Sequence, residues 1–136
     1  MPLIKLPKLR KGSKLPPMVV DFIEAYNARD VEGMLADVSD DVMYRHYCDA
    51  GVLFKAGDKD TFEAALHDDL SAFKQRTQMV KTSMTMLGST VLTTQFDAVV
   101  AKDLPNGWTA GQSITLPAAA EFQFRDDKIA NITLRT

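Results

Sequence analysis

The first half of the chain repeats its hydrophobic residues at helical spacing. An apolar residue returns every three or four positions within residues 18–27, 31–38 and 59–74, which predicts three amphipathic helices. Asp30 and Asp58 stand just before the second and third helices, where a carboxylate can accept hydrogen bonds from first-turn N–H groups. Each helix is therefore expected to turn one face to a core.

After Arg76 the pattern changes from helical spacing to strand-like runs rich in Thr, Val, Met and Phe. Strands are predicted near residues 78–87, 90–102, 109–124 and 129–135. Asn106 and Gly107 mark a hairpin turn, and Pro117 marks a bulge or an edge within its long strand, because proline has no N–H for a neighbouring strand. Helices first and strands later predict an α+β domain with an antiparallel sheet.

An earlier strand is predicted at residues 42–48, after a turn formed by Ser39, Asp40 and Asp41. Alternation along this strand turns one set of side chains inward: Val42, Tyr44, His46 and Cys48. The opposite set points away from the core: Met43, Arg45 and Tyr47. Residues 49–57 show no regular pattern and are predicted to be irregular.

Size and composition suit one globular domain. The chain has 136 residues, of which 46% are hydrophobic and 25% are charged. Its one cysteine, Cys48, excludes an internal disulfide, and no run is long and apolar enough for a membrane span. Lys5 and Pro7 interrupt the apolar start of the chain, which argues against a signal peptide. We therefore expect a cytoplasmic protein with no membrane partner.

The residue types also limit the cofactors. No glycine-rich phosphate loop is present, so no nucleotide is expected. His46, Cys48 and His67 are the only soft metal ligands, and no recognised spacing links them. The expectation is therefore a protein without metal or cofactor.

Positive charge is concentrated at the start of the chain. Residues 1–17 hold five basic and no acidic residues, so the remaining residues must carry −7 to give the net charge of −2. A basic tail can touch nucleic acid or anionic lipid, but single-strand binders usually add aromatic rings for stacking, and this tail has none. We predict a solvated arm at 1–17, a domain at 18–136 and no nucleic-acid partner. A partner-binding role for the arm is a weaker alternative.

Residues 22–30 read Phe-Ile-Glu-Ala-Tyr-Asn-Ala-Arg-Asp, a helix that ends in a short joint before the next helix. Together with the later turn, strand, third helix and long strands, this order resembles the NTF2-like superfamily, which includes ketosteroid isomerases, SnoaL-type polyketide cyclases and scytalone dehydratase. The resemblance covers about residues 18–136. It implies an α+β cone in which three N-terminal helices pack on a strongly curved antiparallel sheet that encloses a pocket. It also implies a homodimer through the outer face of the sheet.

The isomerases of this superfamily use a tyrosine on the first helix and aspartates on the first strand and on a late strand. In this chain those positions fall on Phe22, His46 and Ala120. Phe22 and Ala120 have no side-chain donor, so the two groups that hold an enolate oxygen in those enzymes are missing. His46 can still move a proton, because imidazole titrates near neutral pH. The chain is therefore not expected to be a steroid isomerase.

His46 is the main catalytic candidate, since the resemblance places it where the family has a general base. Tyr44, on the same strand face, and Tyr26, one helical turn after Phe22, are candidates to orient a ligand carbonyl. For each of the three, the alternative is a structural hydrogen bond with no catalytic role. Cys48 shares the face of His46, but roughly 7 Å separates alternate residues of a strand, which is too far for a direct pair.

The predicted pocket lining is apolar, with aromatic rings and small alanines that leave room for a flat ligand. The candidate ligand-binding residues are Phe22, Phe96, Ala120, Phe122, Phe124 and Ile132. The alternative is that side chains from the helices fill this space. Several polar residues are expected to face solvent or the outer face of the sheet: His67, Asp68, Asp69, Asp97, Arg45 and Glu121.

Two classes of function follow. The first is an isomerase, cyclase or dehydratase that acts on an apolar ketone-type molecule, with His46 as the acid and base. The second is a non-catalytic module for ligand binding or dimerisation that keeps the fold without the chemistry. The sequence leaves both classes open.

Overall fold

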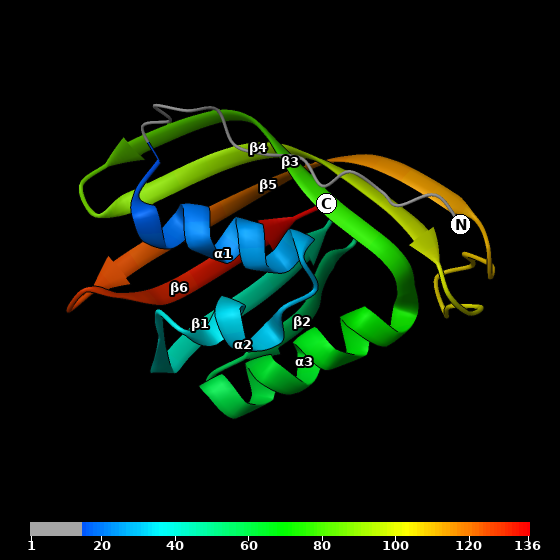
Figure 1. Ribbon diagram of the computed structural model, residues 1–136, viewed down its shortest axis with the longest axis horizontal. Helices are drawn as coiled ribbons and strands as arrows, with labels where there is room; N and C mark the ends of the chain where they lie inside the picture. The colour runs from blue at the N-terminus through cyan, green and yellow to red at the C-terminus, as the bar shows by residue number, and fades with distance from the viewer. Residues whose placement is uncertain (1–14) are drawn as a thin grey trace.

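The computed structural model describes residues 15–136 and confirms an α+β architecture, with three helices on one side of a six-stranded sheet (Figure 1). The elements are α1 Pro17–Asn27, α2 Val31–Leu35, β1 Val38–Cys48, β2 Gly51–Ala56, α3 Lys59–Ala72, β3 Phe73–Met86, β4 Ser89–Val100, β5 Ser113–Arg125 and β6 Lys128–Arg135. Most of the predicted basic arm, residues 1–14, lies outside the described residues.

The six strands form one sheet in the order β2-β1-β6-β5-β4-β3. Neighbouring strands are antiparallel except β1 and β6, which run parallel, with Tyr44 opposite Ile132 and His46 opposite Leu134. The sheet is therefore mixed and not wholly antiparallel as expected, and it is not strongly curled. The reason is long-range: β6, the last strand in sequence, enters between β1 and β5, and no local pattern signals this insertion.

The first helix begins at two prolines and is held by its apolar stripe. Pro17 stands in the first turn of α1, where the backbone N–H has no helical partner and a proline therefore costs nothing. Val19, Phe22 and Ile23 are buried, as their spacing predicts. The chain leaves α1 through Arg29, whose φ of 61° is left-handed and separates the two helices.

The predicted N-caps of α2 and α3 are confirmed. The Asp30 carboxylate accepts a hydrogen bond from the Gly33 N–H at 3.0 Å. The Asp58 carboxylate accepts one from the Thr61 N–H at 2.7 Å. Each cap satisfies a first-turn donor and typically contributes about 1 kcal/mol to stability.

Two predictions around β1 are wrong. Ser39, Asp40 and Asp41 do not form a turn but lie inside β1, which begins at Val38. Val38 pairs with Ile129 of β6 and regular pairing resumes at Met43, so the three residues lie at a register shift between two paired parts of one strand. Residues 49–57 are not irregular either, because β2 lies within them and pairs antiparallel with β1 at the edge of the sheet.

The four late strands are confirmed, with limits that differ by a few residues from those predicted. Pro117 lies opposite Gln95 of β4, whereas β5 meets β6 only from Ala119 onward, opposite Arg135. Pro117 therefore has a strand neighbour on one side only. This is a local edge, as predicted, where the missing N–H removes no sheet hydrogen bond.

The main core lies between the helices and the inner face of the sheet. Phe22 of α1 meets Phe122 of β5 edge to face, with ring centroids 5.3 Å apart. A smaller cluster lies beside the loop between β4 and β5, where Phe73 contacts Phe96 at 5.6 Å and Trp108 at 6.3 Å between centroids. The two clusters divide the inner side of the fold into two packed regions.

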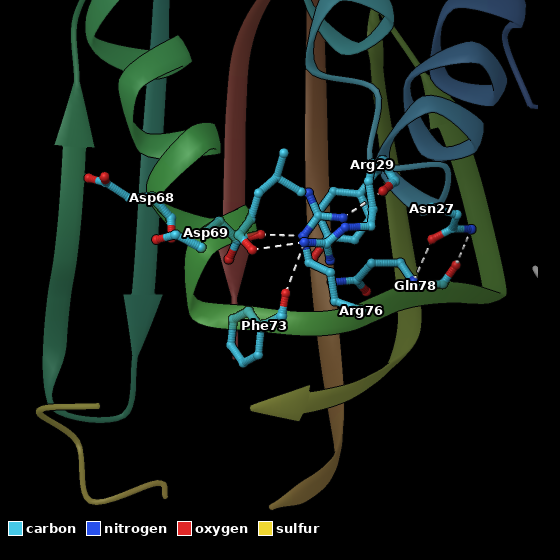
Figure 2. Close-up of polar contacts among 10 residues, drawn as sticks. Asn27, Arg29, Asp68, Asp69, Phe73, Arg76 and Gln78 are labelled. Atoms are coloured by element: carbon cyan, nitrogen blue, oxygen red, sulfur yellow. Dashed lines mark hydrogen bonds and ion pairs between the residues drawn. The ribbon is translucent and has the colours of Figure 1, made fainter. Parts of the chain in front are cut away.

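One side chain ties α1 to β3 with two hydrogen bonds. The buried Asn27 amide donates to the Gln78 carbonyl at 3.1 Å and accepts from the Gln78 N–H at 2.8 Å (Figure 2). Since β3 is an edge strand, Asn27 takes the place of the missing strand neighbour at this point. The end of α1 is thereby fixed over the inner side of β3.

We expect Asn27→Ala to lower the free energy of unfolding by about 2–3 kcal/mol, because a buried N–H and a buried carbonyl lose their partner. Urea unfolding followed by circular dichroism measures this change. Gln123→Ala, on the exposed outer face of β5, is the control and should change stability by less than about 0.5 kcal/mol. Equal losses in the two variants would contradict the role given to Asn27.

Candidate functional site

His46 lies half-buried on the inner face of β1, as the alternation of the strand predicts. Its Nε2 is 3.1 Å from the Thr136 Oγ1, within hydrogen-bond distance. Burial lowers the pKa of His46 below its ordinary value, and the negative charge of Asp69 partly opposes this shift. The imidazole is therefore neutral at pH 7, and one ring nitrogen is able to accept a proton.

Tyr44 lies two residues before His46 on the same face. Its ring packs on Phe62 of α3, with centroids 4.7 Å apart, and contacts Phe54 of β2 at 6.1 Å. Burial raises the pKa of Tyr44, and the charge of Asp69 raises it further. The phenol stays protonated, and among the described residues its hydroxyl has no hydrogen-bond partner. Tyr44 therefore offers a donor to a bound molecule.

Tyr26, the third predicted catalytic residue, is more enclosed. The Arg76 guanidinium stacks on its ring, with the central guanidinium carbon 3.6 Å from the ring centroid. Burial raises the pKa of Tyr26, the charge of Asp69 raises it further, and a hydrogen bond from the Gln78 side chain acts in the opposite direction. The phenol is thus protonated and already has a partner inside the protein.

Arg76 of β3 is 1% exposed, although the sequence gives it no predicted role. Its Nε pairs with the Asp69 carboxylate (Figure 2), and its Nη1 donates to the Tyr26 carbonyl at 2.5 Å. The alternation of β3 is the one local signal that could have indicated it. Arg76 precedes the buried Gln78 by two residues and so shares its inward face.

Asp69 corrects the prediction that Asp68 and Asp69 form a solvated face of α3. Asp68 is exposed and points away from the arginines in Figure 2. Asp69 has a side-chain exposure of 34% and pairs with the buried Arg76. The cause is tertiary, because β3 follows α3 directly and brings Arg76 back against the last turn of the helix.

A second arginine lies beside the first. The Arg29 Nη2 donates to the backbone carbonyls of Leu70 at 2.8 Å and Phe73 at 2.9 Å, at the end of α3 (Figure 2). These carbonyls form the negative end of the helix dipole, which favours a cation. Burial lowers the pKa of Arg29, and the charge of Arg76 lowers it further.

These side chains come from four elements and lie on the inner side of the sheet. Tyr26 comes from α1, Tyr44 and His46 from β1, Asp69 from α3 and Arg76 from β3. The charge of Asp69 affects the pKa of both tyrosines and of His46, so Asp69 lies within electrostatic reach of all three. Direct contacts join Tyr26, Asp69 and Arg76, whereas Tyr44 and His46 share only the influence of the Asp69 charge. We call these five residues the inner cluster.

The six predicted ligand-binding residues also lie on the inner side. Four of them are buried: Phe22, Phe96, Phe122 and Ile132. Two are partly buried: Ala120 and Phe124. Phe22 and Phe122 fill space by packing on each other, and Phe96 belongs to the smaller cluster near the β4–β5 loop. Their part in ligand binding stays a prediction.

Two hollows of the surface are lined mostly by residues of the outer face of the sheet. One has a volume of about 420 Å³ and is lined by residues such as Gln75, Asp97 and Thr115, and also by Arg76 of the inner cluster. The other has a volume of about 600 Å³ and is lined by residues such as Gln95 and Pro117. The alternation of β4 and β5 turns these side chains outward, which confirms the prediction for Asp97. Neither hollow includes a residue that the sequence predicts to be catalytic.

Three further polar residues lie where the sequence predicts them. His67 is exposed on α3, and Arg45 and Glu121 both lie opposite Thr133 on the outer face, as predicted. Cys48 is a half-buried free thiol. Within the described residues, no group of three or more His, Cys, Asp or Glu side chains is arranged to hold a metal ion. No helix in this part of the chain is long and apolar enough to cross a membrane.

Comparison with known proteins identifies the domain and its fold. Residues 19–132 match the family model of a SnoaL-like domain. No curated protein matches the chain in sequence. Among solved structures, a proposed polyketide cyclase from Xanthomonas campestris pv. campestris is 22% identical with a TM-score of 0.71, over 88% of this chain and 87% of that chain.

Two further structures support the same fold. An NTF2-like protein of unknown function from Burkholderia pseudomallei K96243 is 18% identical with a TM-score of 0.70, over 86% of each chain. AclR, a proposed hydroxylase from Streptomyces galilaeus, is 19% identical with a TM-score of 0.69, over 86% of this chain and 71% of that chain. At such low identity the likeness establishes the NTF2-like fold and not the reaction.

We expect Asp69→Asn to lower the free energy of unfolding by about 2 kcal/mol, because it leaves the buried Arg76 charge without its carboxylate. The estimate lies below the cost of breaking a fully buried pair, since Asp69 is partly exposed. Asp68→Asn is the matched control and should stay within about 0.5 kcal/mol of wild type. Urea unfolding at pH 7 measures both, and a larger loss for Asp68→Asn would refute this assignment.

Proposed function

The chain belongs to the SnoaL-like domain family, and on this premise we propose that it acts on a small, apolar, ketone-type molecule as an isomerase, cyclase or dehydratase. His46 is the acid and base in this proposal. One observation carries it: a neutral, half-buried imidazole on the inner face of the sheet, beside a phenol without a partner. The name of the similar Xanthomonas structure, a proposed polyketide cyclase, agrees with a ligand that contains carbonyl groups.

The three reaction types share one step, the removal of a proton from a carbon next to a carbonyl. The neutral imidazole of His46 takes this proton, and the bonding electrons move onto the carbonyl oxygen to give an enolate. The Tyr44 hydroxyl donates a hydrogen bond to that oxygen, where the negative charge develops. The imidazolium then returns the proton, to another carbon in an isomerisation or to a departing hydroxyl in a dehydration.

Tyr26 has a supporting part in this proposal. Its ring is covered on one face by Arg76, and its hydroxyl interacts with Gln78, so it has less freedom to meet a ligand than Tyr44 has. We assign it to holding the Arg76 side chain in place. The stacked ring and the Tyr26 carbonyl both contact the guanidinium.

A non-catalytic binding or dimerisation module is the second candidate. The contact between Phe22 and Phe122 favours it, because these rings occupy space that the predicted pocket would need. Thr136, within hydrogen-bond distance of His46, gives the imidazole a purely structural partner. Under this reading the fold binds a molecule or a second copy and turns nothing over.

We also propose a cytoplasmic homodimer that pairs through the outer face of the sheet. Support comes from exposed apolar side chains on that face near the β3–β4 turn, namely Met84, Met86 and Val91. Apolar surface of this kind is commonly covered by a partner. Such a dimer would leave the inner cluster on the opposite face of the sheet free to bind a ligand.

We expect His46→Gln to reduce the turnover of polycyclic hydroxyketones at least about 100-fold, because glutamine cannot exchange a proton near neutral pH. The assay follows the absorbance of the conjugated ketone over a panel of such compounds. His67→Gln is the matched control, since His67 is exposed on α3, and it should keep wild-type rates. Saturable turnover that survives in His46→Gln would contradict the acid–base role of His46. No turnover by the wild-type protein would favour the binding module.

We expect the rate to fall as the pH drops through a value below 6.5, the ordinary value for histidine. The sign follows from the lowered pKa of His46: the neutral form is the base, it predominates above that pKa, and protonation removes it below. The profile of kcat/KM against pH in the free enzyme measures this. A profile that rises toward acid pH would show that protonated His46 is required and would overturn the assignment.

A further inference from the structure

One guanidinium nitrogen of Arg76 has no partner among the described residues. Nε pairs with Asp69 and Nη1 donates to the Tyr26 carbonyl, whereas Nη2 is buried and makes no hydrogen bond. The guanidinium has five N–H donors, and a buried charged donor without an acceptor is costly. An acceptor atom on a bound molecule would supply the missing hydrogen bond.

The surroundings of Arg76 carry more positive than negative charge. Arg29 and Arg76 are both cations, and Asp69 is the one carboxylate that pairs with either of them among the described residues. Tyr26 and Tyr44 are neutral phenols. Arg29 is held by backbone carbonyls, and its Nη1 is also buried without a partner. One negative charge would balance the group.

Asp69 is the solvent-facing member of this group. The Asp69 side chain is 34% exposed, whereas the Arg76 side chain is fully covered. The half-buried His46 and the unpartnered Tyr44 hydroxyl belong to the same inner cluster. Arg76 also contributes to the lining of the hollow of about 420 Å³ described above.

The geometry points to Arg76 as a residue that recognises an ionised oxygen, so that the site selects apolar molecules carrying one carboxylate, phenolate or enolate group. The inference rests on the proposed function, which places the ligand at the inner cluster. It adds that this ligand carries a negative charge. A guanidinium suits such oxygens because it donates directed, charge-assisted hydrogen bonds. It also gives the inner face a positive group, whereas Phe22 and Ala120, at the isomerase donor positions, supply no donor.

Two matched pairs of probes test this inference on the full chain. The anions 2-naphthoate and 2-hydroxy-1,4-naphthoquinone are compared with methyl 2-naphthoate and 2-methoxy-1,4-naphthoquinone, which keep the rings and lack the charge. Isothermal titration calorimetry at pH 7.5 should show an anion binding at least about tenfold more tightly than its neutral partner. A preference in one pair alone identifies the carboxylate or the enolate as the recognised group. Equal affinities within both pairs, or no binding by any probe, would overturn the inference.

Variants show whether Arg76 is the cause. Arg76→Met should abolish the preference for the anion, so that the two members of each pair bind with equal affinity. Asp69→Asn keeps Arg76 and removes its competitor, so the preference should increase at least about threefold. Asp68→Asn is the matched control and should behave as wild type. If Arg76→Met does not fold, Asp69→Asn decides, and an unchanged preference there contradicts the inference.

His46→Gln separates this inference from the proposed function. The variant should keep the preference for the anion, because Arg76 is untouched, while turnover of the hydroxyketones is lost. Turnover by wild type without a charge preference would reject the role of Arg76 and leave the acid–base proposal standing. A charge preference in a protein without turnover would reject the catalytic proposal and support the role of Arg76.

Discussion

A single enclosed guanidinium organises the inner side of this protein. Arg76 takes contacts from two elements: a carboxylate from α3, and both the backbone carbonyl and the ring of Tyr26 from α1. A cation removed from water needs such compensation, so the ends of α1 and α3 must stay close to β3 for the fold to be stable. Arg29 and Asn27 reinforce the same junction from α1 and the turn that follows it, through backbone groups of α3 and β3. His46 and Tyr44, for which the chemistry is proposed, lie within electrostatic reach of Asp69 at this junction.

The charge states around the junction are complementary. Burial keeps both phenols protonated and keeps the imidazole neutral, so the groups that could touch a ligand are uncharged donors and one uncharged base. The fixed charges belong to Arg29, Arg76 and Asp69. In the proposed reaction, this separation would let the proton-moving groups work near neutral pH, while the field of the cations would act on the oxygen where negative charge develops.

Local patterns predicted much of the fold and part of the site. The stripe of α1, the caps Asp30 and Asp58 and the inward face of β1 depend on neighbours in sequence, and they are confirmed. The early start of β1, the strand β2 and the parallel pairing with β6 depend on partners far along the chain. The pairing of Arg76 with Asp69 was missed for a similar reason. Both residues look exposed by type, and only the return of β3 against α3 brings them together.

The place of β6 in the sheet has a consequence for how the chain folds. Before β6 docks, the β1–β2 hairpin and the three-stranded β3–β5 meander have no shared edge, because β6 alone joins them. Contacts that close such long loops come late and slow the reaction, as in other topologies of high contact order. During synthesis, a ribosome-bound intermediate would expose two unpaired strand edges until the final strand emerges. Substitutions in β6 would therefore be expected to affect aggregation of the nascent protein more strongly than equally buried substitutions in α1.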